Sequence, residues 1–493
     1  MGRGAMKAMA DIRFLRHSMF NQEFRRTFTI CVTLLVIGGQ LRAQKAPLRA
    51  VKIALDAKTA GGACPPDFIG FGYETSAVAQ TNYFRGDNRT LIQLYRQLGS
   101  NGLIRIGGNI SDHTRYEPDG TSAVNTERAV TVINRRNLED LAAFARATGW
   151  KVMWGLNLGT GSKEASAREA AAVARILGDR LHSFEIGNEV DLHGRYELKY
   201  HDFNSYYSNY LAYRASILAV LPSADVSGPD VAVNFPWLRA FAQEEGKKVK
   251  LLTHHYYRAG AASPAATMEN LLKTDERWQD RLSQLQTVSG LSGVPFRINE
   301  INSFSGGGKV GVSDTFASAL WCLDFMCQAA VFGCEGVNLE TDINQLGWIS
   351  HYSPIVHNED GTCEARPEYY GMLAFALAGK GNRLGTTLVK DGEINLSAYA
   401  TREDEKIWLI VVNKDFACDA ELTLPLPDGY GGPEAFRLEA PSMDSTDGST
   451  LAGAKISPDG QWIPGPPGKV LTEGRSARFS VPHASALLLR LQR

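Results

Sequence analysis

The chain has 493 residues, of which 44% are hydrophobic and 21% charged, and its formal net charge is −1 at pH 7. This length predicts either a large barrel with an accessory domain or three smaller domains. The near-average composition argues against a largely disordered or repetitive chain. The charge balance argues against a basic surface for nucleic acid.

The first 43 residues are typical of a secretory signal. Arg25 and Arg26 precede an apolar run at 27–39, and the small residue Ala43 follows it. The run is short for a bilayer span, although an N-terminal anchor or a core segment is the alternative. We therefore expect a secreted or periplasmic protein that has no membrane contact after cleavage. Cleavage would leave 45 basic and 51 acidic residues, a formal charge of about −6.

Eight short apolar runs alternate with amphipathic, helix-like segments, several of which close with Gly. This alternation predicts a (β/α)8 barrel at 67–380 with an active site at the C-terminal ends of its strands. A doubly wound open sheet is the alternative, but no G-x-G-x-x-G turn follows the first run. The runs lie at 68–73, 102–108, 151–158, 181–188, 224–229, 251–257, 294–299 and 335–340.

The pattern of predicted secondary structure changes at residue 381. From there to residue 493 the chain reads as short strands such as INLSAYAT and KIWLIVVN, separated by Gly and Pro turns. This pattern predicts an antiparallel β-sandwich. The strand-like segment 44–66 ahead of the barrel is expected to join it. A structural role for this domain is favoured over carbohydrate binding.

Two glutamates stand at the ends of predicted barrel strands. Asn188 and Glu189 end the fourth run, and Asn299 and Glu300 end the seventh. The barrel would bring both carboxylates to one site at the C-terminal ends of its strands, although helix capping or a surface position is the alternative. In glycoside hydrolysis one carboxyl group protonates the departing oxygen, while a second attacks the anomeric carbon or activates water. The pair therefore predicts a glycosidase.

Three motifs carry a resemblance to a known family. The residues GNEV around Glu189, HHYY at 254–257 and NEINSFSGGG from Asn299 resemble glycoside hydrolase family 79, the β-glucuronidases and heparanases of clan A. The G-N-E motif alone marks only the clan, whereas the combination is more specific. The resemblance runs from about residue 51 to the C-terminus and includes the order of barrel and sandwich.

The resemblance implies a retaining exo-β-glucuronidase without a cofactor, acting on a carbohydrate with a terminal glucuronic acid. Glu189 would be the acid and base, and Glu300 the nucleophile. Asn188 would bind the sugar 2-hydroxyl, Tyr256 would orient Glu300, and Glu74 would line the pocket unless it forms a salt bridge at the barrel rim. The other implied pocket residues are Asn109, Gly306, Gly307 and Tyr352, of which the last three would hold the sugar carboxylate.

The adjacent His254 and His255 raise the question of a metal. No H-E-x-x-H, H-x-x-E-H or C-x-x-C spacing occurs, so a metal centre is not expected. Alternation along a strand sends one imidazole inward and the other outward. We expect His254 in the pocket and His255 in packing.

One residue departs from the family pattern. Ser305 precedes the triple glycine where family members usually carry Tyr. The lost phenol predicts fewer contacts with a uronate, or a pocket that admits a modified sugar such as 4-O-methyl glucuronic acid. A glycosidase for a neutral sugar, endo action on a uronic-acid polymer, and a carbohydrate-binding protein on an inactive barrel are the alternatives. The scarcity of Lys and Arg runs favours exo action on small or terminal glucuronides.

Overall fold

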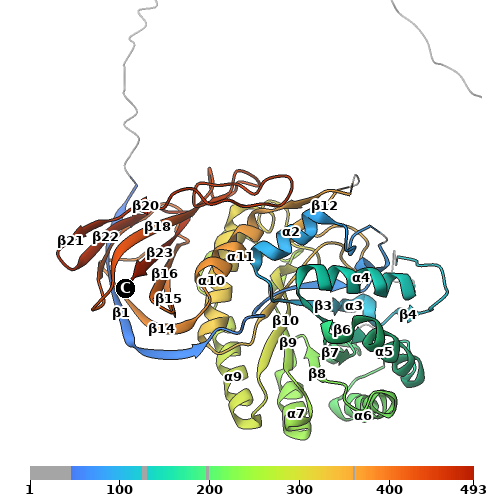
Figure 1. The fold of residues 1–493 in the computed structure, drawn as a ribbon. Coiled ribbons are helices and arrows are strands. Elements are labelled where there is room, and N and C mark those ends of the chain that lie inside the picture. The colour runs from blue at the N-terminus through green and yellow to red at the C-terminus, as the bar shows by residue number, and fades with distance from the viewer. Residues whose placement is uncertain (1–45, 81, 125–129, 196–198, 359–360) are drawn as a thin grey trace, which may run out of the picture. The chain divides into compact units, whose positions relative to one another are not determined.

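The computed structural model describes residues 46–80, 82–124, 130–195, 199–358 and 361–493. Eight parallel strands close into a barrel in the order β10-β11-β2-β3-β6-β7-β8-β9. Figure 1 shows the barrel with helices around it. Each predicted run overlaps one of these strands, so the (β/α)8 prediction is confirmed and the open sheet is excluded. The strands are β2 Ile69–Glu74, β3 Leu103–Gly107, β6 Lys151–Leu156, β7 Leu181–Ile186, β8 Val226–Val231, β9 Leu252–Gly260, β10 Phe296–Ser305 and β11 Val337–Glu340.

Helices surround the barrel, and each long one follows a strand. Asn134 caps α4 with its side chain, and Gly149 ends it with φ +86°, a left-handed conformation that suits glycine. The long helices are α2 Arg89–Leu98, α4 Arg135–Thr148, α5 Lys163–Leu177, α6 Phe203–Val220, α7 Phe235–Glu245, α9 Glu276–Ser292, α10 Phe316–Val331 and α11 Pro367–Ala378. Short elements in the connections are α1 Ser76–Ala79, α3 Gly108–Ser111, α8 Met268–Leu272, β4 Thr114–Tyr116, β5 Thr131–Ile133, β12 Ile355–His357 and β13 Cys363–Ala365.

The interior of the barrel is unusually polar. Arg105 of β3 is fully buried, and its guanidinium pairs with Glu185 of β7 at 3.1 Å and with Asp230 of β8 at 2.6 Å. Opposite charges must compensate one another here because an unpaired charge in a low-dielectric interior is very costly. Arg105, Glu185 and Asp230 thus form a layer of buried charges beneath the C-terminal ends of the strands, here called the charged floor.

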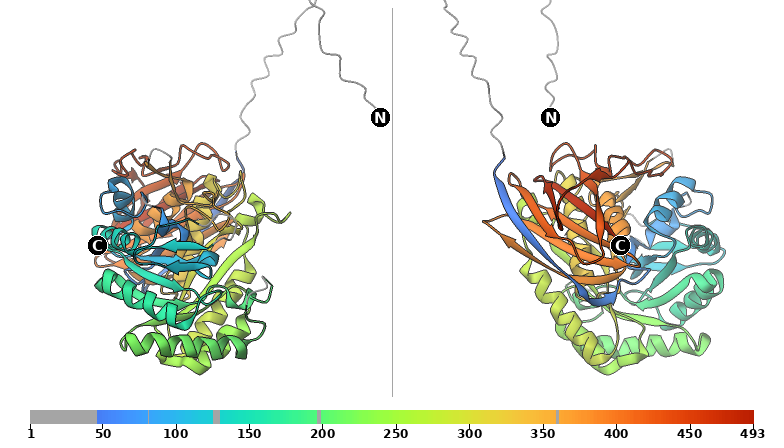
Figure 2. Two further views of the ribbon diagram at one scale, coloured as in Figure 1. Left: turned by 90° about the vertical axis from the view of Figure 1, so that its right-hand side faces the viewer. Right: turned by 60° about the vertical axis from the view of Figure 1, so that its left-hand side comes forward.

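The C-terminal domain is a single curled sheet of eleven strands, mostly antiparallel. Strand β1, Leu48–Ala63, lies inside it between β14 and β17, pairing antiparallel with the first and parallel with the second. Figure 2 shows this blue strand beside the orange strands of the sheet. The other strands are β14 Asn382–Lys390, β15 Leu396–Glu403, β16 Lys406–Asn413, β17 Asp419–Pro425, β18 Gly431–Glu439, β19 Thr450–Leu451, β20 Gly468–Lys469, β21 Leu471–Glu473, β22 Ser476–Val481 and β23 Ser485–Gln492.

The sheet packs directly on the barrel helices α10 and α11. Trp408 and Phe436 of the sheet belong to the same buried apolar cluster as the barrel core. At this contact Asp324 of α10 accepts a hydrogen bond from Tyr399 at 2.7 Å and pairs with Lys414 at 2.6 Å. A continuous core of this kind holds the two parts together.

The predicted signal at 1–43 lies outside the described residues. Within the ranges that the structure describes, no helix is both long and apolar enough to cross a bilayer. Six cysteines in those ranges are buried and free: Cys64, Cys322, Cys327, Cys334, Cys363 and Cys418.

Candidate active site

A sharp turn after β7 presents Glu189. Gly187 has φ +88°, and a Cβ built on it would approach Val190 and Leu158 to within 3 Å. Glu189 itself has φ +44°, a left-handed conformation that costs a non-glycine residue about 1–2 kcal/mol. Backbone strain of this kind clusters at functional sites, and here it turns the carboxylate into a cavity.

An irregularity in β10 re-aims Glu300. The pairing of β10 with β9 shifts register between Ile298 and Glu300, which is how a β-bulge turns a side chain near an active site. Glu300 accepts hydrogen bonds from Arg105 Nη1 at 2.9 Å and from the Tyr257 hydroxyl at 3.0 Å. Two donors therefore hold this carboxylate in one orientation.

The two glutamates border one cavity of about 480 Å³ at the C-terminal ends of the strands. Ser305 and Glu340 also line it. Apart from Asn188, every residue that the sequence placed in the site lines this cavity: Glu74, Asn109, Glu189, His254, Tyr256, Glu300, Gly306, Gly307 and Tyr352.

Asn188 lies behind the cavity wall. Its side-chain oxygen accepts a hydrogen bond from Arg105 at 2.6 Å, and its nitrogen donates to Asn109 at 3.2 Å. Asn109 in turn donates to Gln345, which lines the cavity. One N–H group of Asn188 is thus used within the protein, and the predicted contact of Asn188 with the sugar 2-hydroxyl stays a prediction.

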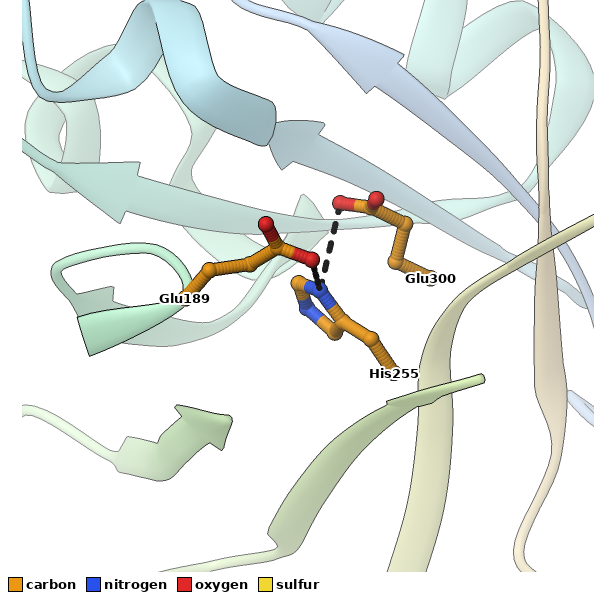
Figure 3. A group of neighbouring side chains, drawn as sticks. All are labelled: Glu189, His255 and Glu300. Carbon is orange, nitrogen blue, oxygen red and sulfur yellow. Dashed lines mark hydrogen bonds and ion pairs between the residues drawn. The ribbon is translucent and has the colours of Figure 1, made fainter. Parts of the chain in front are cut away.

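The expectation for His255 is wrong, whereas His254 lines the cavity as expected. His255, assigned to packing, lies between the glutamates: its Nδ1 is 3.2 Å from Glu189 Oε1 and 3.5 Å from Glu300 Oε2, as Figure 3 shows. Its Nε2 is 2.7 Å from Asp230. His254 also borders the cavity, but it faces the outer helices, where Arg281 of α9 donates to its Nε2 at 2.9 Å.

The prediction that Tyr256 orients Glu300 is also wrong, because Tyr257 donates the hydrogen bond to that carboxylate. The Tyr256 hydroxyl donates to Asp275 at 2.7 Å, and its ring packs on Trp278 of α9. Both corrections have one cause. Side chains along β9 alternate with period two, so an error of one position sends every side chain to the opposite face.

Burial and neighbouring charges set the protonation of the site. Burial raises the pKa of Glu189, and the negative Glu300 acts in the same direction, whereas His255 opposes them. Burial alone would lower the pKa of His255, but Glu300 and Asp230 hold that pKa well above its usual range. A carboxylic acid that keeps its proton beside an ionised carboxylate is what acid catalysis requires.

The triple glycine forms a fixed loop at the cavity edge. Gly306, Gly307 and Gly308 have φ of +80°, +86° and +82°, which L side chains rarely adopt. The Gly308 amide donates to Phe304 at 3.2 Å, whereas the amides of Gly306 and Gly307 have no acceptor among the residues described. Two free N–H groups beside a cavity suit an anionic group.

Sequence reasoning missed Arg105, Asp230, His255, Tyr257 and Glu340. A charged residue inside the apolar run LIRIGG was a signal for Arg105, because an arginine in a buried strand needs carboxylate partners. Glu340 ends the eighth run as Glu189 and Glu300 end theirs, and that signal was present too. Asp230 lies at an irregularity in β8, and the sequence does not show which alternate residues of β9 point inward.

Glu189, His255 and Glu300 also have the ligand types of a metal site. One oxygen or nitrogen atom from each lies within 4.8 Å of the others. A carboxylate pair with an imidazole suits zinc or a similar divalent cation as well as it suits acid and base catalysis. Removal of divalent cations with a chelator distinguishes a metal site from acid and base catalysis without a metal.

No family model matches the chain. A β-glucuronidase of Aspergillus niger is 25% identical over 389 residues, which cover 70% of this chain and 69% of that protein. A β-glucuronidase of Neurospora crassa is 23% identical, covering 67% of this chain and 66% of that one. A Bos taurus heparanase is 25% identical over 49% of this chain and 45% of its own length.

Solved structures show the same fold. A 4-O-α-L-rhamnosyl-β-D-glucuronidase of Fusarium oxysporum superposes with a TM-score of 0.72 at 18% identity, covering 89% of this chain and 99% of that one. An α-L-arabinofuranosidase of Thermotoga maritima superposes with a TM-score of 0.65 at 14% identity, covering 90% and 100%.

The barrel, the paired carboxylates and these relatives define the chain as a glycoside hydrolase that acts on a carbohydrate. Its curated relatives are β-glucuronidases and heparanases, which confirms the resemblance to glycoside hydrolase family 79.

Proposed function

We propose that this chain is an exported, retaining exo-β-glucuronidase that hydrolyses terminal β-linked glucuronic acid. One observation carries the reaction: Glu189 and Glu300 face one cavity, with an oxygen of each within 4.8 Å of the other. Carboxyl groups about 5–5.5 Å apart suit direct attack on the anomeric carbon, whereas inversion needs about 6.5–9.5 Å to admit a water molecule. The spacing therefore favours retention.

In the first step Glu300 attacks the anomeric carbon while Glu189 donates its proton to the departing oxygen. The carboxylate is held for attack by Arg105 and Tyr257. Formation of the ester removes the charge on Glu300, so the pKa of Glu189 falls and the ionised group can accept a proton from water. Water then releases the sugar with its configuration retained.

Specificity for a uronic acid is supported by the glycine loop. The free amides of Gly306 and Gly307, together with Tyr352 beside the same loop, can bind the C6 carboxylate. The Aspergillus niger and Neurospora crassa relatives bear the name β-glucuronidase. Ser305 lines this part of the cavity without a phenol, which leaves room for a modified glucuronic acid such as a 4-O-methyl derivative.

The test is hydrolysis of matched aryl β-glycosides by the purified chain, namely the glucuronide, the glucoside and the xyloside. We expect glucuronide turnover at least about 100-fold above the neutral sugars in kcat/KM. NMR of the first product should show the β anomer. Equal rates on the glucoside would overturn the uronate assignment, and an α anomer would overturn the mechanism.

A further inference from the structure

Glu340 is a cavity residue that the proposed reaction does not use. It is the last residue of β11, it lines the cavity, and it is only 5% exposed. Its Oε2 atom is buried and has no hydrogen-bond partner among the described residues. Leaving a buried carboxyl oxygen without a hydrogen-bond partner costs about 1–3 kcal/mol of folding free energy, so such a group needs a physical explanation.

The fold makes specific room for this carboxyl group. Glu340 lies opposite Gly72 in the pairing of β11 with β2. A Cβ built on Gly72 would collide with Glu340 Oε2. Any larger residue at position 72 would displace the carboxyl group, so Gly72 lets the side chain lie across β2 at the cavity wall.

The neighbouring Glu74 behaves differently. Its Oε2 accepts a hydrogen bond from the amide of Ile110 at 2.8 Å, and a Cβ on Gly108 would collide with its carboxyl group. The backbone therefore pins Glu74. Glu340 also lines the cavity, but its Oε2 lies buried against Gly72 and no hydrogen bond from the described residues holds that atom.

Charges from four strands face Glu340. Burial raises its pKa well above the usual range, and Glu300 and Glu74 act in the same direction, whereas Arg105 and His255 oppose them. A carboxyl group that keeps its proton can donate one hydrogen bond and accept another. A sugar hydroxyl is the natural partner, since it also does both.

The order of the barrel strands indicates which hydroxyl. Under the proposed function the anomeric carbon lies between Glu189 and Glu300, and the C6 carboxylate lies at the glycine loop after β10 and at Tyr352 after β11. The next strands around the barrel, moving away from β10, are β11 and then β2. In a pyranose ring C4 adjoins C5, so the wall formed by these two strands faces C4 and not C2.

We propose that Glu340 binds the C4 hydroxyl of the terminal sugar and makes the enzyme selective for an equatorial over an axial oxygen at that position. This inference rests on the proposed function for the orientation of the sugar. A site built to hydrogen-bond a hydroxyl rejects analogues that lack it, because its own buried polar atoms are then left unpaired.

The experiment compares C4 epimers. Wild type, Glu340→Ala and Glu340→Gln are assayed on aryl β-glucuronide against β-galacturonide, and on β-glucoside against β-galactoside. Wild type should prefer the gluco epimer by at least about 100-fold in kcat/KM. Glu340→Ala should reduce that preference at least 10-fold, mainly through a higher KM. Glu340→Gln, whose amide also donates and accepts, should keep most of it.

Glu368→Gln is the matched control. Glu368 is also buried, also carries an oxygen without a partner among the described residues, and has a pKa that burial raises, but it does not line the cavity. Its replacement should leave the epimer ratio unchanged. Thermal unfolding of each variant shows whether any loss reflects folding.

A uniform loss on both epimers in Glu340→Ala, with an unchanged ratio, would overturn the inference. If wild type hydrolyses glucosides but not glucuronides, the proposed function fails while the glucoside and galactoside pair still tests Glu340. If nothing is hydrolysed, binding of the four methyl β-glycosides measured by NMR gives the same comparison. Equal binding of the epimers by wild type would then count against Glu340.

Discussion

Asp230 Oδ1 lies 2.7 Å from His255 Nε2, and both side chains are about 1% exposed. Asp230 also pairs with Arg105, which in turn reaches Glu300. The two proposed catalytic glutamates therefore contact a network of buried side chains whose charges alternate in sign. Removing one member leaves its partners charged and unpaired in a low-dielectric interior.

Asp230→Asn should lower the free energy of unfolding by about 3–5 kcal/mol at neutral pH, because it breaks two buried ion pairs. Urea unfolding measures this. The folded pKa of His255 lies above the unfolded value of about 6.5, so its contribution is complete below that pH and is lost as the pH rises through the folded value. The difference between variant and wild type should thus shrink at alkaline pH.

The control for Asp230 is Asp225→Asn. Asp225 pairs with Lys250 at 2.8 Å near the start of β8, but it is 59% exposed. A surface pair of this kind contributes less than about 1 kcal/mol. Equal losses in the two variants would contradict the buried network.

Replacement of the two glutamates should have different kinetic consequences. Glu300→Ala should reduce turnover of every substrate below about 10⁻³ of wild type, because the nucleophile is gone. Glu189→Ala should slow substrates with poor leaving groups by about 10²–10⁴-fold and largely spare the formation of the ester from activated ones. Steady-state and burst kinetics on a series of aryl leaving groups measure both.

The alkaline limb of the pH profile should report Glu189. Since burial raises its pKa, kcat/KM should fall with rising pH at a value above the usual 4.3 of a glutamic acid. Glu189→Ala should lose that limb on activated substrates. Persistence of the limb in the variant would assign it to another group.

Tyr257→Phe should lower kcat about 10- to 100-fold, since it removes a hydrogen bond to the charged Glu300. Tyr256→Phe is the matched control on the same strand, because its hydroxyl contacts Asp275 and Arg277 and not the nucleophile. We expect less than about a threefold change in kcat there. The reverse ranking would restore the assignment made from sequence.

Gly306→Ala should lower kcat/KM for the glucuronide about 10-fold more than for the glucoside, because a strained backbone at φ +80° tilts the amides that face the cavity. Gly311→Ala is the control. Gly311 has φ +72° and, like Gly306, nothing within 4 Å of an added Cβ, but it does not line the cavity. We expect both variants to lose a similar amount of melting temperature, but only Gly306→Ala to lower the ratio of glucuronide to glucoside kcat/KM.

Activity should survive chelation. The proposed reaction uses Glu189, His255 and Glu300 without a metal, although their atoms lie close enough to bind one. Prolonged treatment with EDTA should leave kcat/KM unchanged, and added zinc should compete with the sugar and inhibit. Loss of activity with EDTA and its recovery with zinc would instead identify a metal-dependent enzyme.

Much of the fold followed from local patterns. The eight apolar runs coincide with the eight barrel strands because buried parallel strands need continuous apolar residues, and this demand is visible in the sequence. Glu189 and Glu300 were located because both end such runs, where a barrel gathers its active site. The joining of β1 to the C-terminal sheet was likewise suggested by its strand-like composition.

The sequence patterns did not predict which side chains of β9 point into the barrel and which point outward. Tertiary pairing introduces register shifts in β10 and β8 beside it, and these shifts are not encoded in any short pattern. The choice between His254 and His255 therefore depended on neighbours far away in the chain. The same holds for the charged floor formed by Arg105, Glu185 and Asp230, whose members come from three strands.

By itself the sequence determined the class of fold and the two carboxylates, because hydrophobic runs and strand-end glutamates act locally. Only the tertiary structure decided which imidazole and which phenol reach them, and that Glu340 lines the same cavity. Those outcomes depend on barrel closure and on strand pairing with period two, where a shift of one residue reverses every side chain.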